Sequence, residues 1–328
     1  MRTAEELSAI SRQLGVPFIF RAGAWKPRTS PHTFQGAGEE ALGWLKEVKE
    51  NYGMEVATEV ATPEHVEAAL KAGIDYLWIG ARSSANPIAV QSICSAIGDW
   101  RWKIGDLKLK AILIKNPVNA DAALWLGNIE RLEKTSIPVM AVHRGCNHLP
   151  CWAMAHKVRM ARPDIPMLLD PSHMSGEAAK IQALLRKVEE LHLDGAMIEV
   201  HCCPEEALSD ANQQITPIGL RDSLDPILSR LCLVSLICPS QGQEELNWLR
   251  AEIDELDDTL WECIAARMDV SRRIGEWKKE HGVAPLQPER YQEKREELRA
   301  KSEELGLSAS FVDTIWNIIH EQSLKQQE

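Results

Sequence analysis

Residues 197–214, MIEVHCCPEEALSDANQQ, place three potential metal ligands directly after a short apolar segment. A strand that begins at Met197 is predicted to deliver Glu199 and His201 at its C-terminal end, and Asp210 follows in the next loop. Carboxylate and imidazole groups that converge in this way are typical of a divalent metal site. The alternative is that each side chain only caps the strand or forms a local pair.

A second strand of the same kind lies upstream. Residues 167–173, MLLDPSH, also begin with apolar residues and end with Asp170 and His173. Two successive strands that end in this way predict a barrel with its chemistry on one rim. Apolar strands alternate with helical patterns from the start of the chain, which favours a parallel sheet covered by helices. The seven strands expected are residues 18–20, 55–60, 76–79, 111–114, 139–142, 167–169 and 196–200.

The composition is that of an ordinary globular protein. The 328 residues carry a net charge of −11, which disfavours a general nucleic-acid surface but leaves room for a local cationic cleft. No apolar run approaches the roughly 18 residues of a membrane span, and residues 1–15 predict an amphipathic helix, not a signal peptide. Eight cysteines without a disulfide framework indicate reduced thiols. A soluble, cytoplasmic protein is expected.

Four of the predicted strands carry a cation on the rim that also holds the potential metal ligands. Arg21 follows the first strand, Arg82 the third, Lys115 the fourth and Arg144 the fifth. Cations at successive positions of one rim suit a substrate with phosphate and carboxylate groups. Solvated surface charge is the alternative for any one of them.

Six motifs follow one another in an order that resembles a known family. They are KPRTSP (Lys26–Pro31), GAR (Gly80–Arg82), KNPVN (Lys115–Asn119), HRG (His143–Gly145), DPSH (Asp170–His173) and EVH with SD (Glu199–His201, Ser209–Asp210). The set is similar to the signatures of 3-deoxy-D-arabino-heptulosonate 7-phosphate (DAHP) synthases. Residues 21–23 (RAG) followed by Trp25, and residues 209–214 (SDANQQ), resemble the smaller subclass of that family, which includes fusions to chorismate mutase.

The resemblance implies a (β/α)8 TIM-type barrel that condenses phosphoenolpyruvate with erythrose 4-phosphate and needs a divalent metal ion (Mn, Fe, Co or Zn). The metal would polarise the aldehyde, and fixed cations would position two anions that repel each other. Lys115 is the candidate for proton transfer near the new alcohol. By similarity, Lys26, Arg82, Lys115 and Arg144 hold phosphoenolpyruvate, Arg28, Thr29 and Ser30 hold the aldose phosphate, and His173, Glu199 and Asp210 hold the metal.

One motif of the family is missing. The family's first strand ends in Ala-Gly-Pro-Cys, whose cysteine is the fourth metal ligand, and this chain begins in the helix after that strand. We therefore expect seven strands instead of eight, two unpaired sheet edges and weaker or different metal binding. A start placed too far downstream or a natural truncation would explain the difference. Cys202 is not expected to replace the ligand, because it follows His201 on the opposite strand face.

The last third of the chain changes to a purely helical pattern. Apolar residues recur every three or four positions from Leu246 to Ile264, Pro288 opens a second helix, and Ser308 caps a third. Three helices cannot bury this stripe alone, so a homodimer through the long helix is expected. Residues 231–237 are expected to form an apolar strand or a buried tail at the end of the barrel. The expected domains are a barrel at residues 1–238, a linker at 239–243 and a helical domain at 244–328.

The helical region resembles the all-helical chorismate mutases, which convert chorismate to prephenate. That rearrangement is pericyclic, so holding the folded substrate and stabilising charge on its ether oxygen suffices. Gln287 and Tyr291 depart from the family pattern, where aspartate and glutamate are common. On spacing alone, the alternative is that the cations of this region are solvated charges on acidic helices. The residues implied by similarity are Arg250 (from a second protomer), Arg267, Lys278, Arg290, Ser323 and Gln327.

The sequence thus predicts a DAHP synthase-like barrel, short of its first strand, followed by an all-α three-helix chorismate mutase domain. The resemblance to such fusions implies that chorismate or prephenate, bound at the helical domain, inhibits the barrel. Two alternatives stay open. The barrel could be a non-catalytic or regulatory scaffold beside an active mutase, or it could be a different metal-dependent aldolase.

Overall fold

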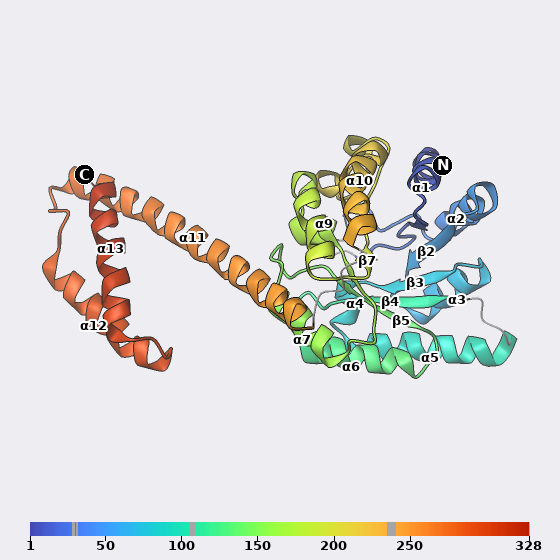
Figure 1. The fold of residues 1–328 in the computed structure, drawn as a ribbon, viewed down its shortest axis with the longest axis horizontal. Coiled ribbons are helices and arrows are strands. Elements are labelled where there is room, and N and C mark those ends of the chain that lie inside the picture. The colour runs from blue at the N-terminus through green and yellow to red at the C-terminus, as the bar shows by residue number, and fades with distance from the viewer. Residues whose placement is uncertain (28–29, 31, 105–108, 235–240, 328) are drawn as a thin grey trace. The chain divides into compact units, whose positions relative to one another are not determined.

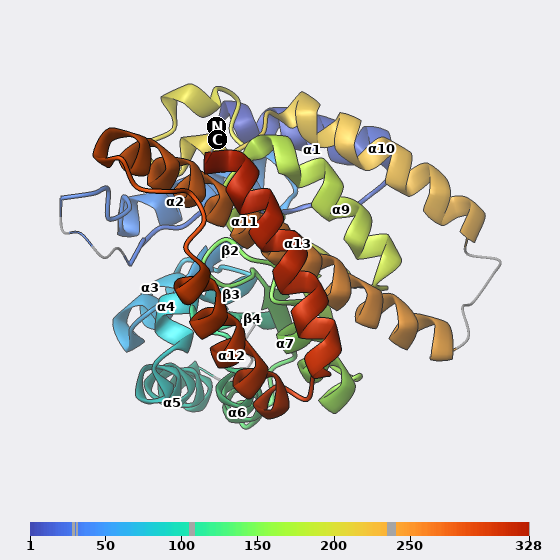
Figure 2. The same cartoon turned by 90° about the vertical axis from the view of Figure 1, so that its left-hand side faces the viewer.

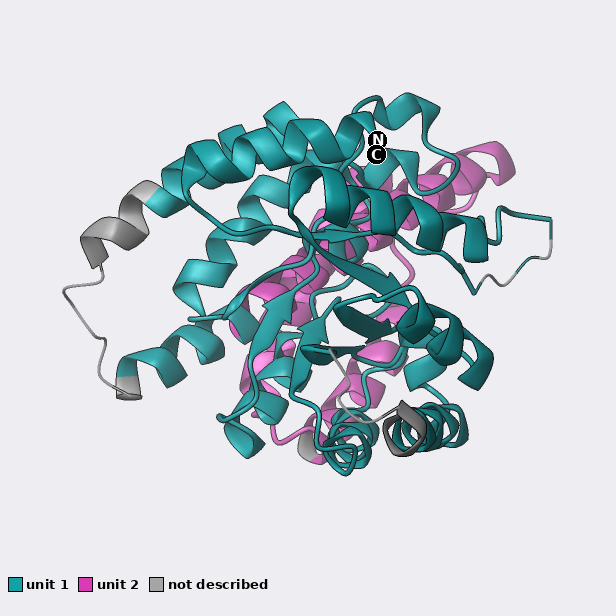
Figure 3. Ribbon diagram, turned by 90° about the vertical axis from the view of Figure 1, so that its right-hand side faces the viewer, with its two compact units in different colours: residues 1–252 teal, residues 253–328 magenta. Residues whose placement is uncertain are grey.

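The computed structural model describes residues 1–27, 30, 32–104, 109–234 and 241–327. The chain divides into two compact units, residues 1–252 and residues 253–328 (Figure 3). Within the described residues, no helix combines the length and the apolar character that crossing a membrane would require.

The first unit is built on one sheet of parallel strands (Figure 1). Each strand pairs with the next one along the chain, so the order is β1 to β7 and the described strands confirm the predicted count of seven. Among the described residues, β1 and β7 each pair with a single strand and form the two edges of the sheet. The strands are β1 (Ile19–Arg21), β2 (Glu55–Glu59), β3 (Tyr76–Ile79), β4 (Ala111–Lys115), β5 (Val139–His143), β6 (Met167–Leu169) and β7 (Gly195–Ala196).

Helices follow the strands, and local sequence sets where they begin and end. The Thr62 hydroxyl accepts the backbone N–H of His65, and the Asp121 carboxylate accepts that of Leu124, which caps two helices at their N-termini. Gly15 ends the first helix with φ of 66°, a conformation that favours glycine. The helices are α1 (Arg2–Leu14), α2 (Glu39–Tyr52), α3 (Pro63–Lys71), α4 (Ala81–Ser84), α5 (Pro87–Ile104), α6 (Ala122–Glu133), α7 (Trp152–Ala161), α8 (Pro171–Ser175), α9 (Ile181–Glu190) and α10 (Pro217–Val234).

Both faces of the sheet are apolar, because helices cover one face and the barrel interior lies behind the other. Alternate residues of each strand point to opposite faces. Leu77 and Ile112 belong to the large cluster between strands and helices, whereas Trp78 and Leu113 belong to a smaller cluster inside the sheet. This arrangement explains why the strands read as continuous apolar runs rather than alternating ones.

Two strand predictions need correction. The last predicted strand is shorter than expected, because β7 ends at Ala196 and only Val200 beyond it forms an isolated bridge, to Ile215. The strand predicted at 231–237 is wrong where the chain is described, since residues 231–234 continue helix α10. Apolar residues at a helical spacing upstream of residue 231 make continuation of the helix the better solution. Residues 235–240, which include part of the predicted linker, lie outside the described part of the chain.

The second unit contains most of helix α11 (Gln241–His281), together with α12 (Pro288–Glu304) and α13 (Ala309–Gln327). Pro288 opens α12 as expected, and the Ser308 hydroxyl accepts the backbone N–H of Phe311 at the start of α13. Helices α12 and α13 lie side by side, and Arg295 forms an ion pair with Asp313 across them, with a distance of 3.0 Å (Figure 2).

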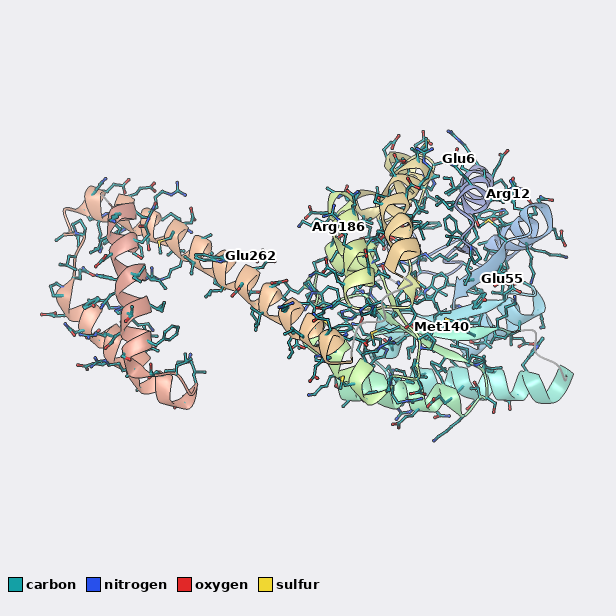
Figure 4. All side chains as sticks on the ribbon, in the orientation of Figure 1. Glu6, Arg12, Glu55, Met140, Arg186 and Glu262 are labelled. Carbon is teal, nitrogen blue, oxygen red and sulfur yellow. The ribbon has the colours of Figure 1, made fainter. Side chains whose placement is uncertain are left out.

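This unit has little apolar core of its own. Ile253, Leu256 and Leu260 on α11 are 58%, 67% and 54% exposed, and the neighbouring Glu262 also projects from this helix (Figure 4). Among its described residues, the buried side chains are all polar. They are Ser271, Lys278, Ser302, Ser323 and Gln327.

Candidate active sites

The first unit contains a pocket of about 730 Å³, lined by charged side chains at the strand ends and by apolar side chains of the strands and of helices α9 and α10. Ala57 and Leu113 face the inside of the sheet, so the residues two positions later on the same strands, Glu59 and Lys115, face inside as well. Met140, labelled in Figure 4, contributes to the apolar part of the lining. The charged and amide side chains that line the pocket include Arg21, Lys26, Glu59, Arg82, Lys115, His173, Glu199, Asp210 and Gln214.

A buried chain of charges crosses the pocket wall from β4 to α8. Lys115 Nζ donates to Asp170 Oδ2 at 2.6 Å, with side chains that are 5% and 0% exposed. The other neighbour of Asp170 is His173, whose Nδ1 lies 2.9 Å from Oδ2. Burial alone would raise the pKa of Asp170, but His173 and Lys115 outweigh it and hold the pKa well below its usual range. The ammonium of Lys115 is thus fixed at the pocket by a permanent carboxylate.

Glu199 is held by polar groups on both of its oxygens. Arg21 forms an ion pair with Oε1, and Gln213 Nε2 donates to Oε2 at 2.6 Å. Burial by itself would raise the pKa of Glu199, but the Arg21 guanidinium and His173 overcome this effect and keep the pKa at about 2. Arg21 also lies over the Trp78 ring, with 5.2 Å between the guanidinium carbon and the ring centroid. The sequence-based prediction includes Arg21 only as a cation at a strand end, and it gives Gln213 no role.

Glu59 is a further pocket residue that sequence reasoning missed. Burial raises the pKa of its carboxyl group, although Lys115 and Arg21 oppose this shift. The carboxyl group lies directly against Gly80, where a Cβ atom would clash with Oε1. The available signal was its position, because Glu59 ends β2 in the same inward register as Lys115 on β4. A carboxyl group with a raised pKa next to fixed cations can accept and release protons.

Of the other predicted substrate-binding residues, some line the pocket and some do not. Lys26 lines the pocket and donates to Asp210 Oδ2 at 3.2 Å, while Arg82 lines it and donates to the Pro27 carbonyl at 3.1 Å. The structure does not place Ser30 in the pocket lining, and its side chain is exposed. Arg144 is also outside the lining, and burial lowers the pKa of its guanidinium. Residues 28 and 29, the predicted Arg28 and Thr29 contacts, lie outside the described residues.

The predicted metal ligands do not share a coordination sphere as they are arranged. His173 Nε2 lies 4.0 Å from Glu199 Oε1, close to the largest separation that two bonds of about 2.1 Å to one ion allow. Glu199 is engaged by Arg21 and Gln213, and Asp210 by Lys26. In the described ranges, no three His, Cys, Asp or Glu side chains form a group that could hold a metal ion. The donors therefore do not fit a bound ion in this arrangement, and the ligand assignment stays a prediction.

Two residues near these strand ends face away from the pocket. His143 ends β5 in the outward register, where it is buried beside Trp152 with 5.4 Å between ring centroids. Its Nε2 lies 2.7 Å from the Pro150 carbonyl oxygen, and burial lowers the pKa of the imidazole to about 4. His201, the third ligand candidate of the 197–214 stretch, is outside the pocket lining, and its Nδ1 lies 2.7 Å from the Cys203 carbonyl oxygen.

In the second unit, α11 and α13 bring four predicted mutase residues together in two pairs. Arg267 donates to the Ser323 hydroxyl, and Lys278 Nζ donates to Gln327 Oε1 at 3.0 Å. Gly275 allows the close approach of these helices, because a Cβ atom at this position would come within 2.5 Å of Gln327 Cα.

The two remaining mutase candidates lie apart from these pairs. Arg290 is exposed and lies 3.6 Å from Glu293 on the same helix. Arg250 belongs to the first compact unit and is exposed. The structure thus assembles the Arg267–Ser323 and Lys278–Gln327 pairs without Arg290, and Arg250 falls outside the unit that holds them.

Two family models match this chain over separate ranges. The DAHP synthetase I family model matches residues 1–225, and the type II chorismate mutase model matches residues 249–328. The two ranges cover the sheet with its pocket and the three-helix region, respectively.

Individual proteins agree with both matches. A phospho-2-dehydro-3-deoxyheptonate aldolase from Thermotoga maritima is 32% identical over 66% of this chain, which spans 60% of that relative's length. A solved DAHP synthase structure from the same organism has a TM-score of 0.60 at 25% identity, covering 71% of this chain and 66% of that one. A 4-amino-4-deoxychorismate mutase from Streptomyces venezuelae is 36% identical over 24% of this chain and 75% of its own. The chain therefore belongs to the DAHP synthetase I family, with a type II chorismate mutase region fused after its seven-stranded barrel-like domain.

Proposed function

We propose that the barrel-like unit condenses phosphoenolpyruvate with erythrose 4-phosphate to form DAHP. The observation that carries this proposal is the convergence of Arg21, Lys26 and Lys115 from three separate segments on one pocket. Phosphate and carboxylate groups are the ligands that such fixed cations bind best. Two anionic substrates that repel each other in water would be held together there, which lowers the entropic part of the barrier.

The pocket residues can handle the protons of this reaction. C3 of phosphoenolpyruvate attacks the aldehyde carbon, water adds at C2, and phosphate leaves. The Lys115 ammonium, held by Asp170, donates a proton to the aldehyde oxygen as it becomes a hydroxyl group. Glu59, with its raised pKa, accepts a proton from the attacking water. Members of this family are often metal-dependent, but among the described residues no group of donors is arranged to hold a metal ion.

The direct test is consumption of phosphoenolpyruvate with erythrose 4-phosphate, with and without added Mn²⁺. Lys115→Met should abolish turnover, whereas Lys110→Met should retain it. Lys110 is a matched control because it precedes the same strand at the opposite end, where it pairs with Glu55. No turnover by the unmodified chain would favour the scaffold alternative. Turnover with a five-carbon aldose phosphate alone would favour the different aldolase.

We infer that the helical unit converts chorismate to prephenate. Arg267 and Lys278 supply positive charge for a dianion, and Ser323 and Gln327 supply neutral hydrogen-bonding groups beside them. A homodimer through α11 would cover the exposed Ile253–Leu260 stripe and could supply Arg250 from the second protomer. We also propose a cytoplasmic location, as expected from the sequence.

Chorismate disappearance, followed by its ultraviolet absorbance, tests the second activity. Lys278→Met should abolish it, and Lys279→Met, one position further on the same helix, is the matched control. Because the S. venezuelae relative is a 4-amino-4-deoxychorismate mutase, that compound should be assayed beside chorismate. Conversion of the amino compound alone would overturn the proposed substrate while preserving the reaction class.

A further inference from the structure

Beside the Arg267–Ser323 pair, one face of α13 carries two aromatic side chains that no assigned role uses. Trp316, His320, Ser323 and Gln327 follow one another at steps of four, three and four residues, so they share one face of the helix. Arg267 of α11 lies over Trp316, with 5.5 Å between the guanidinium carbon and the ring centroid. The face that pairs with the cations therefore extends past Ser323 to His320 and Trp316.

Helix α12 closes this end of the face with Tyr291. Its ring centroid lies 4.5 Å from that of His320 and 6.1 Å from that of Trp316. The Tyr291 hydroxyl donates to Asn317 Oδ1, which holds the ring in place. All three helices of the unit thus contribute to a small aromatic corner next to Arg267.

Two polar atoms in this corner are sealed from solvent without a partner. Trp316 Nε1 and His320 Nε2 have no hydrogen-bonding partner among the described residues. Buried polar atoms in native proteins are nearly always hydrogen-bonded, because leaving one unpaired forfeits its hydration. The two atoms belong to rings whose centroids are 5.9 Å apart, and a bound molecule can complete both.

The charges around the corner indicate the chemical class of the molecule that binds there. Arg267 and Lys278 on α11 are the cations whose charges act on His320, and Glu321 is the acidic group that does so from its own helix. Burial lowers the pKa of His320, and Arg267 lowers it further, so the ring is neutral at neutral pH. A neutral imidazole beside two cations offers a hydrogen-bonding nitrogen without repelling them, which suits an anion that also carries a hydroxyl group.

We propose that His320 and Trp316 form a polar subsite that contacts the substrate of the helical unit and determines its specificity. His320 Nε2 accepts a hydrogen bond from the ring hydroxyl of a cyclic dicarboxylate, and Trp316 Nε1 donates to the same end of the molecule. Arg267 holds the adjacent carboxylate. This inference rests on the proposed mutase function and adds two contact residues that the family resemblance did not assign.

The test is steady-state kinetics with chorismate for His320→Leu, His320→Gln and Trp316→Phe in the full chain. Loss of one hydrogen bond to a neutral group predicts a KM about five- to tenfold higher for His320→Leu, with kcat changed much less. His320→Gln should stay within about twofold, because its amide reaches the position of Nε2. His281→Leu is the matched control, since that exposed histidine stacks on Trp277 away from the corner.

Unchanged KM in His320→Leu and Trp316→Phe, with the unmodified chain active, would overturn the subsite alone. Equal KM increases in His320→Leu and His320→Gln would overturn it as well, because rescue by the amide distinguishes contact from packing. Failure of the unmodified chain to convert chorismate would remove both the mutase proposal and this inference. If His320→Leu does not fold by circular dichroism, the KM values of the other two variants decide the question.

Discussion

Removing the ammonium of Lys115 should destabilise the first unit sharply, because Asp170 would remain as a buried charge. The two side chains are 5% and 0% exposed and are separated by 2.6 Å. Breaking a buried ion pair from one side costs about 3–5 kcal/mol. In the Lys115→Met variant, Asp170 would still have His173 Nδ1 as a partner at 2.9 Å. The loss of unfolding free energy should therefore lie at the lower end of this range, at about 3 kcal/mol.

The double variant Lys115→Met/Asp170→Asn separates charge from packing. An asparagine oxygen can still accept the backbone N–H of His173, which Asp170 Oδ1 accepts at 3.1 Å in α8. Removing the unpaired charge should therefore restore about 2 kcal/mol of the loss. Condensation activity should stay absent in both variants, because neither has the proton donor.

Urea unfolding with hydrogen exchange provides the assay. Protection of the amides of β4 and β6 reports on the first unit, and the amides of α12 and α13 serve as the internal control. A loss below about 1 kcal/mol in Lys115→Met would show that the pair is solvated and refute the burial argument. A double variant no more stable than the single one would refute the assignment of the loss to an unpaired charge.

Four further predictions follow from individual contacts. Glu59→Gln should lower kcat for condensation by about a hundredfold or more while unfolding stability is kept, since the amide preserves the shape but carries no proton; unchanged kcat would exclude the proton role. The buried His143 has a pKa of about 4, so the unfolded state binds more protons between that value and about 6.5. The unfolding free energy should therefore fall by up to about 3 kcal/mol as the pH drops through this window, and His143→Gln should flatten the slope in urea titrations. Gly275→Ala should separate α11 from α13 and reduce mutase activity and Tm, whereas Gly43→Ala, whose Cβ meets open space, should do neither. Leu256→Glu, at a side chain that is 67% exposed, should convert a dimer to a monomer in light scattering; a monomeric unmodified chain would contradict the dimer.

Periodicity and motif order determined the elements of this protein because both depend on local sequence. Continuous apolar runs located the seven parallel strands, and capping residues such as Ser308 located helix starts. The inward register of Lys115 also follows from the two-residue alternation along β4. The use of apolar runs to locate strands failed at residues 231–234, because a short apolar run fits a strand and a buried helix equally well.

Tertiary structure decided which of the strand-end residues meet and in what charge state. Burial in the folded chain raises the pKa of Glu59, and Glu199 is held by Arg21 from a strand 178 residues earlier. The sequence assigned Glu199 to a metal, yet its oxygens face a guanidinium and an amide in the folded chain. In the helical unit, the corner at His320 exists only where three helices pack together. Burial and pairing across distant segments are properties of the packed chain, so no local pattern encodes them.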